Sequence, residues 1–415
     1  MTEKITLPSG LRIVLESMPQ LRSVSVGLWV SAGSAFETPA QSGMSHFLEH
    51  LLFKGTEKRT ALEISATMEG VGGVLNAFTG REHTCYYTRS MDEHFQLSLE
   101  LLADLFTNSK LDPVEVDRER NVILEEINMY EDSPEDVAAE LFLQALWPQH
   151  PYGRPISGTS RSVQGVSRED LFQYWRQVYI PERTVLAVAG HVELEQVREL
   201  AETLFPVHHG QARPELVAPE PHTGSVSKVK EIEQSHICMG FPGVALDDSD
   251  YYAANVLANI LGGGACSRLF QEVREKRGLS YTSYCYLDAY VGGGYLMAYS
   301  ATQPGRTKEL IDVMAEQFRD IATQGVTDTE LQRSKDQLRG SLLLSMESSS
   351  TVMSRLGRTE LSQGQLYNVE EKVSALAAVS QADIRRVTER LFQPGHMVLA
   401  QVSPDPAPVE AKSLF

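Results

Sequence analysis

Three residues whose types and spacing suit catalysis stand within one short run of the sequence: His46, Glu49 and His50. On a helix, positions i, i+3 and i+4 share one face, so two imidazoles and a carboxylate would point into the same small volume. Two imidazole nitrogens can hold a zinc ion, and a carboxylate one turn away can take a proton from water. A surface helix that carries two ordinary histidines is the alternative explanation. We interpret the run as a metal-binding motif.

A zinc site needs a further protein ligand and an open position for water. The segment 117–127 is the best source of that ligand, because it contains several glutamates in a helical pattern. Glu119 and Glu126 are seven residues apart and would share one helix face two turns apart, whereas Glu125 would point away. Taken without the first motif, these glutamates would be read as a solvated helix face.

The elements that must position these residues follow from the hydrophobic pattern. Strands are expected at 11–15, 26–30, 184–189 and 237–241, and helices at 115–130 and 135–146. Asp112 and Pro113 precede the first of these helices, as an N-cap and a proline suited to the first helical position. We expect the α+β class, with antiparallel sheets covered by helices.

The chain is too long for a single core and predicts two domains. A stretch rich in Pro and Gly and without periodicity predicts a linker at 207–227. We therefore expect a catalytic, zinc-bearing domain at 1–206 and a substrate-binding domain at 228–415.

The two halves follow one plan, because shifting the sequence by 209 places lays 24–55 over 233–264 without a gap. A strand and a helix of one half then fall on a strand and a helix of the other. The positions aligned with the metal motif hold Asn255, Ala258 and Asn259, which supply no zinc ligands. We expect two homologous domains, of which only the first binds metal.

Composition narrows the classes of partner. The 37 basic and 55 acidic residues give a net charge of −18, which argues against nucleic acid as a partner. No apolar run is long enough to span a bilayer, and we see no signal or transit peptide. The four cysteines lack pair spacing, so free thiols in a reducing compartment, the bacterial cytoplasm, are expected.

The order His-x-x-Glu-His is the inverzincin signature, and further runs accompany it at 54–56 (Lys-Gly-Thr), 72–79 and 150–158. Together these runs resemble peptidase family M16, the pitrilysin and mitochondrial processing peptidase family, over nearly the whole chain. The length resembles the branch whose single subunits have two such domains.

This resemblance implies roles for the acidic cluster. The family takes its third zinc ligand from a glutamate on a second helix, at a spacing that Glu126 matches. One Zn²⁺ per chain would then be held by His46, His50 and Glu126, with Glu49 as the catalytic base. Glu119 matches the acid that supports the metal site from behind the ligands.

The resemblance also implies where a substrate lies. Asn76, Ala77 and Thr79 fall in the family's edge strand, which pairs with the substrate backbone; a Gly-bounded core strand is the alternative. Phe53 matches the pocket for a hydrophobic residue just after the cleaved bond. Asp136 and Glu140, four apart on one helix face, align with acids that receive a basic side chain, although such carboxylates are often only solvent-facing.

In the second half, Arg274 and Tyr281 match a family pair that reaches the active site from the side without metal. Arg274 would hold the substrate, and Tyr281 would hydrogen-bond the oxyanion formed at the cleaved carbonyl. A surface charge and a core tyrosine are the alternative. By resemblance the chain forms a homodimer in which these two residues act across the interface.

The expected activity is that of a zinc metalloendopeptidase. Its substrates would be peptides or unfolded segments, with a preference for basic residues before the cleaved bond. The competing class is a non-catalytic or partner-dependent scaffold subunit of the same fold, because family relatives include such subunits. The presence of all the expected ligands, the base and the Arg–Tyr pair in one chain favours the enzyme.

Overall fold

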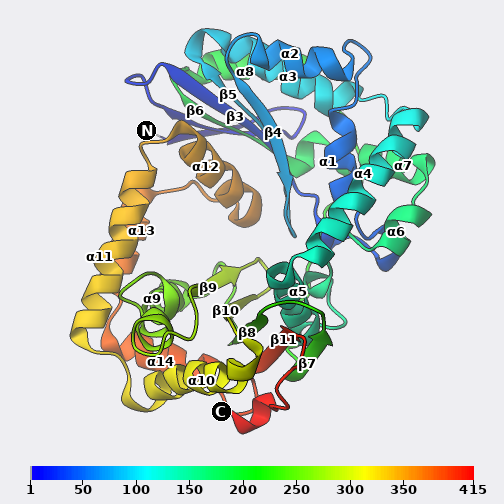
Figure 1. Ribbon diagram of the computed structural model, residues 1–415. Coiled ribbons are helices and arrows are strands. Elements are labelled where there is room, and N and C mark those ends of the chain that lie inside the picture. The colour runs from blue at the N-terminus through cyan, green and yellow to red at the C-terminus, as the bar shows by residue number, and fades with distance from the viewer. Residues whose placement is uncertain (1) are drawn as a thin grey trace. The chain divides into compact units, whose positions relative to one another are not determined.

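The computed structural model describes residues 2–415, which fold into two compact units. Unit 1 contains the chain up to Ile127, Pro155–Glu215 and Leu343–Asn368. Unit 2 contains Asn128–Arg154, Leu216–Leu342 and Val369–Phe415. Each unit is a sheet covered by helices (Figure 1), so the predicted α+β class is confirmed.

Unit 1 is built on a six-stranded sheet in the order β1-β2-β6-β3-β5-β4. Its strands are β1 (Thr2–Thr6), β2 (Arg12–Ser17), β3 (Ser23–Val30), β4 (Val74–Thr79), β5 (Thr84–Met91) and β6 (Thr184–Gly190). Only β2 and β6 run parallel. The strands expected at 11–15, 26–30 and 184–189 are therefore β2, part of β3, and β6.

Unit 2 has a five-stranded sheet in the order β7-β11-β8-β10-β9. Its strands are β7 (Gly224–Val229), β8 (Ser235–Pro242), β9 (Ser283–Ala289), β10 (Gly294–Thr302) and β11 (Val398–Ser403). Here β7 and β11 are the parallel pair. Position by position this order repeats that of unit 1 without β1, which supports the predicted internal repeat.

The sheets are mixed, and this corrects the expectation of antiparallel sheets. In each unit a single parallel pair joins an early strand to the last strand of the sheet along the chain. A parallel neighbour requires a long crossover, and many residues, including helices, separate the two strands in both cases.

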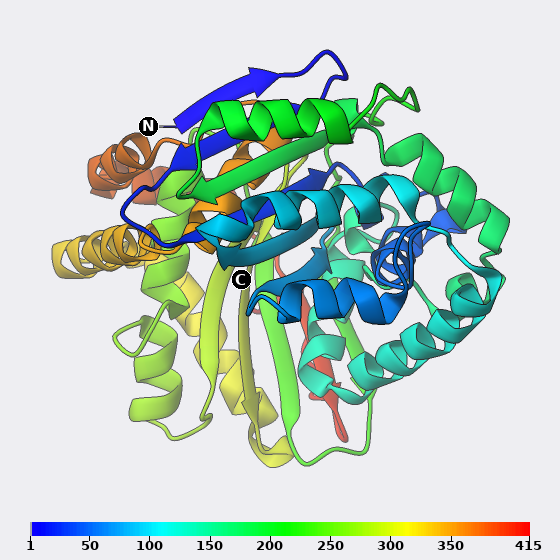
Figure 2. The same cartoon turned by 90° about the horizontal axis from the view of Figure 1, so that it is seen from above.

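Helices of unit 1 cover both faces of its sheet. They are α1 (Met44–Leu52), α2 (Ala61–Glu69), α3 (Phe95–Asn108), most of α4 (Pro113–Asp132), α6 (Ser160–Gly165), α7 (Arg168–Val178), α8 (Leu194–Leu204) and α12 (Ser349–Gln363). Seen from above, α3 and α8 run side by side over the strands (Figure 2). Val26 and Leu28 of β3 point into the core on this side, whereas Trp29 faces the opposite side and α12.

Helices of unit 2 are α5 (Pro134–Leu146), α9 (Tyr251–Gly262), α10 (Thr307–Gln324), most of α11 (Asp328–Ser345), α13 (Val369–Ala378) and α14 (Gln381–Leu391). The helices expected at 115–130 and 135–146 are thus α4 and α5. Pro113 opens α4, and Asp112 Oδ1 accepts a hydrogen bond from the amide of Val114 at 2.8 Å, as an N-cap does. No helix of the described residues is long and apolar enough to cross a membrane.

Each sheet receives one helix from the other half of the sequence. In unit 1, α12 packs on β3 and β6; Trp29 Nε1 donates to Met353 Sδ at 3.4 Å, and a side chain at Gly357 would collide with Trp29. In unit 2, α5 packs on β11 and β8, and Tyr284 donates a hydrogen bond of 2.7 Å to Glu135.

The placement of α5 and α12 can be compared with the domain boundaries expected at 1–206, 207–227 and 228–415. Those boundaries treat each half as continuous, whereas each compact unit includes one segment from the other half. Residues 206–223 contain no helix or strand, in keeping with a linker, but β7 begins at Gly224 inside the segment assigned to it. Local pattern places the elements, and only packing shows which sheet α5 and α12 cover.

Candidate metal centre

The helix α1 is fixed at its N-terminus by buried polar contacts. Glu37 accepts hydrogen bonds from the amides of Gly43 and Ser45 at 2.8 and 2.7 Å, which places a carboxylate where the helix dipole favours it. Gly43 has a φ of 94°, and a Cβ there would also meet the backbone of Ser157. The start of α1 therefore depends on glycine and on an internal cap.

The face of α1 that turns away from the core carries His46, Glu49 and His50, as the helical spacing predicts. Phe47, Leu48 and Leu51 on the other face belong to the core of unit 1. Facing the histidines is α4, whose Glu119 and Glu126 share one face, while Glu125 is exposed. The structure thus brings the two predicted motifs together.

Three side chains converge as a candidate metal site. His46 Nε2 lies 3.5 Å from Glu126 Oε1, and His50 Nε2 lies 3.4 Å from Glu126 Oε2. One ligand atom from each of the three residues lies within 4.8 Å of the others. Hydrogen bonds from the two histidines hold the pKa of the Glu126 carboxyl well below its usual range.

The distance from each imidazole to the nearer oxygen of Glu126 fits zinc. Nitrogen and oxygen ligands about 2.0–2.2 Å from a tetrahedral zinc ion lie roughly 3.3–3.6 Å from one another. The donor set of two imidazoles and one carboxylate is that of several catalytic zinc sites and leaves a fourth position open. His46 is 8% exposed and the side chain of Glu126 is 28% exposed, so the site is sheltered but open to solvent.

Behind the ligands lies a buried ion cluster. Glu119, only 3% exposed, accepts a hydrogen bond from His50 Nδ1 at 3.2 Å and an ion pair from Lys54 Nζ at 2.9 Å. Burial alone would raise the pKa of Glu119, but the bonds from His50 and Lys54 lower it. A carboxylate on the second nitrogen of a histidine orients that ring toward a metal.

The same contacts act on His50. Burial alone would lower its pKa, but the hydrogen bonds to Glu119 and Glu126 and the negative charge of Glu49 raise it to about 9. His46 differs, because its Nδ1 is buried without a hydrogen-bond partner among the described residues. Both imidazoles contact Glu126 through Nε2, but only His50 has a second carboxylate, Glu119, on its Nδ1.

Glu49 is half-buried and directed at strand β4. Its Oε2 accepts a hydrogen bond of 2.5 Å from Thr79 Oγ1. Thr79 was expected to bind substrate, and the structure adds a different contact: it orients the carboxylate expected to act as base. The hydroxyl of Thr84 lies 3.4 Å from that of Thr79 and continues the chain of polar groups.

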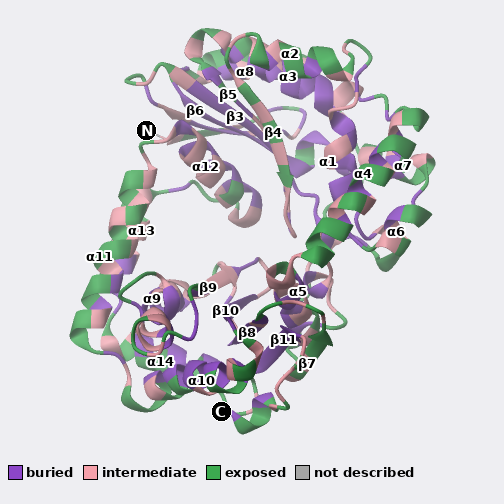
Figure 3. Cartoon of the chain, viewed as in Figure 1, coloured by how far each residue is buried: buried purple, intermediate pink, exposed green. Residues whose placement is uncertain are grey.

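The strand expected to bind substrate, β4, is the edge strand of the sheet in unit 1. Its residues alternate between exposed and intermediate (Figure 3). The amide of Ala77 bonds to Asn76 Oδ1 at 2.8 Å, so it faces the open edge and not β5. An extended peptide could add to this edge by exchanging that side-chain bond for a backbone bond.

The remaining predicted substrate residues lie on two elements. Phe53, the C-cap of α1, is partly buried beside Tyr86, with ring centroids 6.1 Å apart. Asp136 and Glu140 lie on α5 in unit 2, the first exposed and the second half-buried. The roles assigned to these residues stay predictions.

Arg274 and Tyr281 lie together in unit 2. The Arg274 guanidinium stands 4.4 Å from the centroid of the Tyr281 ring and 4.7 Å from that of Phe270. Arg274 also donates to the carbonyl of Tyr281 at 3.3 Å. Tyr281 is 79% exposed, so it is not a core tyrosine. The structure pairs the two residues, and their reach to a substrate stays a prediction.

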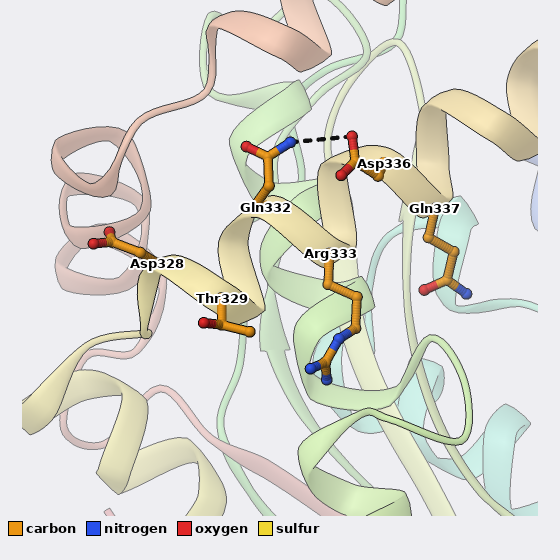
Figure 4. A pocket seen from close by; sticks show the side chains of 6 residues that line it. All are labelled: Asp328, Thr329, Gln332, Arg333, Asp336 and Gln337. Atoms are coloured by element: carbon orange, nitrogen blue, oxygen red, sulfur yellow. Dashed lines mark hydrogen bonds between the residues drawn. The ribbon is translucent and has the colours of Figure 1, made fainter.

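The equivalent helices of unit 2 form no candidate metal cluster among the described residues. On α9, Asn259 donates to Ser334 Oγ at 2.9 Å and to Gln337 Oε1 at 3.2 Å, both on α11. A shallow hollow runs along α11, and all its lining side chains come from that one helix (Figure 4). They are Asp328, Thr329, Gln332, Arg333, Asp336 and Gln337. Nothing opposes these side chains across the hollow, so it does not resemble a site.

Sequence reasoning did not assign Lys54 a role. It stands four residues after His50, so helical spacing alone would have placed it near the same face. Its partner Glu119, however, comes from another helix, and only the fold shows the ion pair. Likewise, no pattern signals that Thr79 bonds to Glu49.

Comparison with known proteins agrees with this geometry. The family model described as "Insulinase (Peptidase family M16)" matches residues 12–160, which include all the candidate ligands. The model described as "Peptidase M16 inactive domain" matches residues 165–338.

Several bacterial relatives match over nearly their whole length. "Uncharacterized zinc protease YmxG" of Bacillus subtilis is 39% identical over 405 residues, covering 97% of this chain and 98% of the relative. "Uncharacterized zinc protease ML0855" of Mycobacterium leprae is 40% identical over 396 residues, covering 94% and 89%. One of Rickettsia bellii is 33% identical over 388 residues, covering 93% and 94%.

Solved structures share the fold. A crystal structure described as the peptidase M16 inactive domain from Pseudomonas fluorescens has a TM-score of 0.90 at 21% identity, covering 98% of this chain and 99% of that one. A protease from Helicobacter pylori has a TM-score of 0.91 at 23% identity, covering 97% and 99%. With family models over both halves and close relatives along almost its full length, the chain belongs to peptidase family M16.

Proposed function

We propose that this protein is a zinc-dependent endopeptidase that hydrolyses peptides or unfolded polypeptide segments. One observation carries the proposal: a nitrogen of His46, a nitrogen of His50 and a carboxylate oxygen of Glu126 lie within 4.8 Å of one another, close enough to hold one zinc ion. Glu49 projects from the same helix face, and the open edge of β4 bonds to it through Thr79. The names of the relatives support the use of zinc. We assign one ion to each chain because the three side chains form one cluster.

His46, His50 and Glu126 hold the ion, and Glu119 and Lys54 keep His50 in orientation. Zinc bound there lowers the pKa of water and polarises a carbonyl group. Glu49 takes the proton of the attacking water and returns it to the leaving amine. Thr79 holds the Glu49 carboxylate toward β4, where the peptide backbone lies.

The substrate adds to β4 as a further strand. Ala77 offers its outward amide, Asn76 releases that amide when the peptide arrives, and main-chain bonds give affinity with little demand on sequence. Phe53 contacts the hydrophobic residue after the cleaved bond. Asp136 and Glu140 of α5 receive an Arg or Lys side chain before it.

The active form is a homodimer in the bacterial cytoplasm. Arg274 and Tyr281 act across the interface, Arg274 holding the substrate and Tyr281 donating a hydrogen bond to the oxyanion. Their stacking and the exposed Tyr281 ring suit a pair presented to a ligand. The four cysteines are free thiols, which fits a reducing compartment.

The test compares wild type, Glu49→Gln and Glu125→Gln on a quenched peptide of about twenty residues that contains arginine, with zinc measured in each protein. Glu125 is exposed on the far face of α4 and serves as the control. The expected result is full zinc in all three and turnover lost, by about 10²–10⁴-fold, only in Glu49→Gln.

Two further outcomes bear on the proposal. Full zinc with no turnover in wild type, alone or at concentrations that favour a dimer, would overturn it in favour of a scaffold subunit. Equal kcat/KM for arginine-containing and neutral peptides would remove the roles of Asp136 and Glu140 and leave the peptidase intact.

A further inference from the structure

We propose that unit 1 has a second binding site, separate in its residues from the metal centre, for a small carboxylic acid with an aromatic or similarly apolar body. The site is a pocket of about 330 Å³ between the end of α3, the end of α7 and the segment that follows α8. None of the candidate metal or substrate residues lines it.

The walls of the pocket are aromatic. Phe106 lies between Tyr179 and Phe205, with ring centroids 5.8 and 5.7 Å apart, and Phe172 and Trp175 of α7 complete the lining. The hydroxyl of Tyr179 is already bonded to that of Tyr86 at 2.9 Å. These rings favour the face or edge of an apolar ring, and Thr107, Arg176 and His208 add polar groups to the same lining.

One buried donor in these walls is unused. The indole nitrogen of Trp175 is shielded from solvent and has no hydrogen-bond partner among the described residues. A buried N–H without a partner is unfavourable. A ligand oxygen is about the size of a water molecule and does not reach a nitrogen that water does not reach, so Trp175 serves the pocket as an apolar wall and as a fluorescent reporter.

The charge at the pocket selects an anion. Arg176 lines it, and its guanidinium forms no ion pair with any described residue; its one ring contact is with Phe172 at 6.0 Å. No acidic side chain of the described residues lines the pocket. Arg176 is exposed, and a guanidinium without an ion pair at the pocket suits a carboxylate.

The pocket has an ordered rim. The segment after α8 crosses the end of α7. There His208 Nε2 bonds to the carbonyl of Arg176 at 3.1 Å, and the amide of Gln211 donates to the carbonyl of Gln177 at 2.9 Å. These bonds hold Val207 and its neighbours over the aromatic walls without using the guanidinium of Arg176. The rim of the pocket is therefore ordered without a bound ligand.

The volume limits the ligand's size. A pocket of about 330 Å³ lies at the small end of ligand sites and holds roughly one ring with a short acid chain. Two sources share this chemistry: a free aromatic acid and the C-terminal carboxylate of a peptide that ends in an aromatic residue.

The experiment titrates the zinc-loaded enzyme with 3-phenylpropionate, its neutral amide, N-acetylphenylalanine and the amide of that compound, by calorimetry and tryptophan fluorescence. Trp29 and Trp147 are 2% and 1% exposed and lie outside the pocket, so Trp175→Phe identifies the reporting ring. Arg176→Gln removes the cation. Arg385→Gln, an exposed change on α14 in unit 2, is the matched control.

The expected result is saturable binding of at least one acid, weakened about tenfold or more by amidation or by Arg176→Gln and unchanged in Arg385→Gln. The fluorescence response should vanish in Trp175→Phe. Preference for N-acetylphenylalanine assigns the site to peptide termini, and preference for 3-phenylpropionate assigns it to free acids. Absence of saturable binding at millimolar probe, or equal binding of acids and amides, overturns the proposal.

Discussion

The two helix pairs that occupy equivalent places in the two units are joined in different ways. In unit 1, α1 and α4 meet through imidazoles, buried carboxylates and Lys54. In unit 2, α9 and α11 meet through the neutral bonds of Asn259 with Ser334 and Gln337. Both pairs rest on a sheet with the same strand order.

The difference separates what the fold requires from what the chemistry requires. In unit 2 the hydrogen bonds between α9 and α11 themselves are neutral, and the charged pair beside them, Arg268 with Glu330, starts outside α9. Buried charges are expensive to desolvate and add little to stability compared with apolar or neutral contacts. The charges around His50 and Glu119 are therefore best explained by a ligand that needs them, and zinc is the ligand whose distances they match.

The largest expected effect comes from making unit 1 resemble unit 2. His50→Asn introduces the amide found at the aligned position, Asn259. The variant should fold but lose its zinc, and peptide hydrolysis should fall by about a thousandfold or more, since zinc and Glu49 act together. Zinc analysis, circular dichroism and turnover measure the three properties. His191→Asn, a half-exposed histidine in unit 1, is the control, and zinc retained by His50→Asn would contradict the assignment.

A smaller effect is expected when the carboxylate behind His50 is made neutral. Glu119→Gln removes the charge that orients His50 and pairs with Lys54. Zinc affinity should fall about 10–100-fold, and turnover should return at high zinc concentration. Competition with a chelator of known affinity gives the value. Glu125→Gln on the same helix should behave as wild type; equal loss in both variants would refute a specific role for Glu119.

The stability of unit 1 should depend on pH through the charge of Asp104, a carboxylate close to the metal site in the sequence and bonded to the segment after α1. Asp104 of α3 accepts bonds from Thr56 and Arg59 at 2.7 and 2.6 Å and from Asn108 at 2.8 Å. Burial alone would raise the pKa of Asp104, but these bonds lower it. A carboxyl whose pKa is lower in the folded chain than its unfolded value of about 3.9 stabilises above that pH, and the effect is lost as the pH falls through the folded value.

Asp104→Asn should therefore lower the opening free energy of α3 amides by about 2 kcal/mol at neutral pH. The difference from wild type should shrink as the pH falls below about 4. Hydrogen exchange of the α3 amides measures the loss at neutral pH and its decrease at acidic pH. A difference that stays constant down to the lowest pH at which the protein is folded would show that the Asp104 charge is not the cause.

The smallest effect on stability is expected in unit 2, where neutral hydrogen bonds join α9 and α11. Asn259→Ala removes its bonds to Ser334 and Gln337 and should lower the opening free energy of α9 and α11 amides by about 1 kcal/mol. Because no charge is involved, the loss should be the same from neutral to acidic pH. Zinc content and turnover should not change, and a drop in zinc would contradict the separation of roles between the units.

Much of the candidate site could be predicted because its parts are local. The 3.6-residue period of a helix puts His46, Glu49 and His50 on one face, and the same period aligns Glu119 with Glu126. Strands β2, β3 and β6 could likewise be read from short apolar runs. The parallel pairs β2–β6 and β7–β11 could not, because local pattern does not reveal the direction of a neighbour brought in from far along the chain.

The sequence by itself determined the kinds of ligand, their helical faces, the repeat and the missing ligands in its second copy. Only the tertiary structure decided that Lys54 pairs with Glu119 and that Thr79 bonds to Glu49. It also decided that α5 and α12 each pack on the sheet formed by the other half of the sequence. It also decided that aromatic rings from three separate segments enclose a pocket beside Arg176. The reason is physical: periodicity acts between residues a few places apart, whereas these contacts join distant segments, and packing of the whole unit selects them.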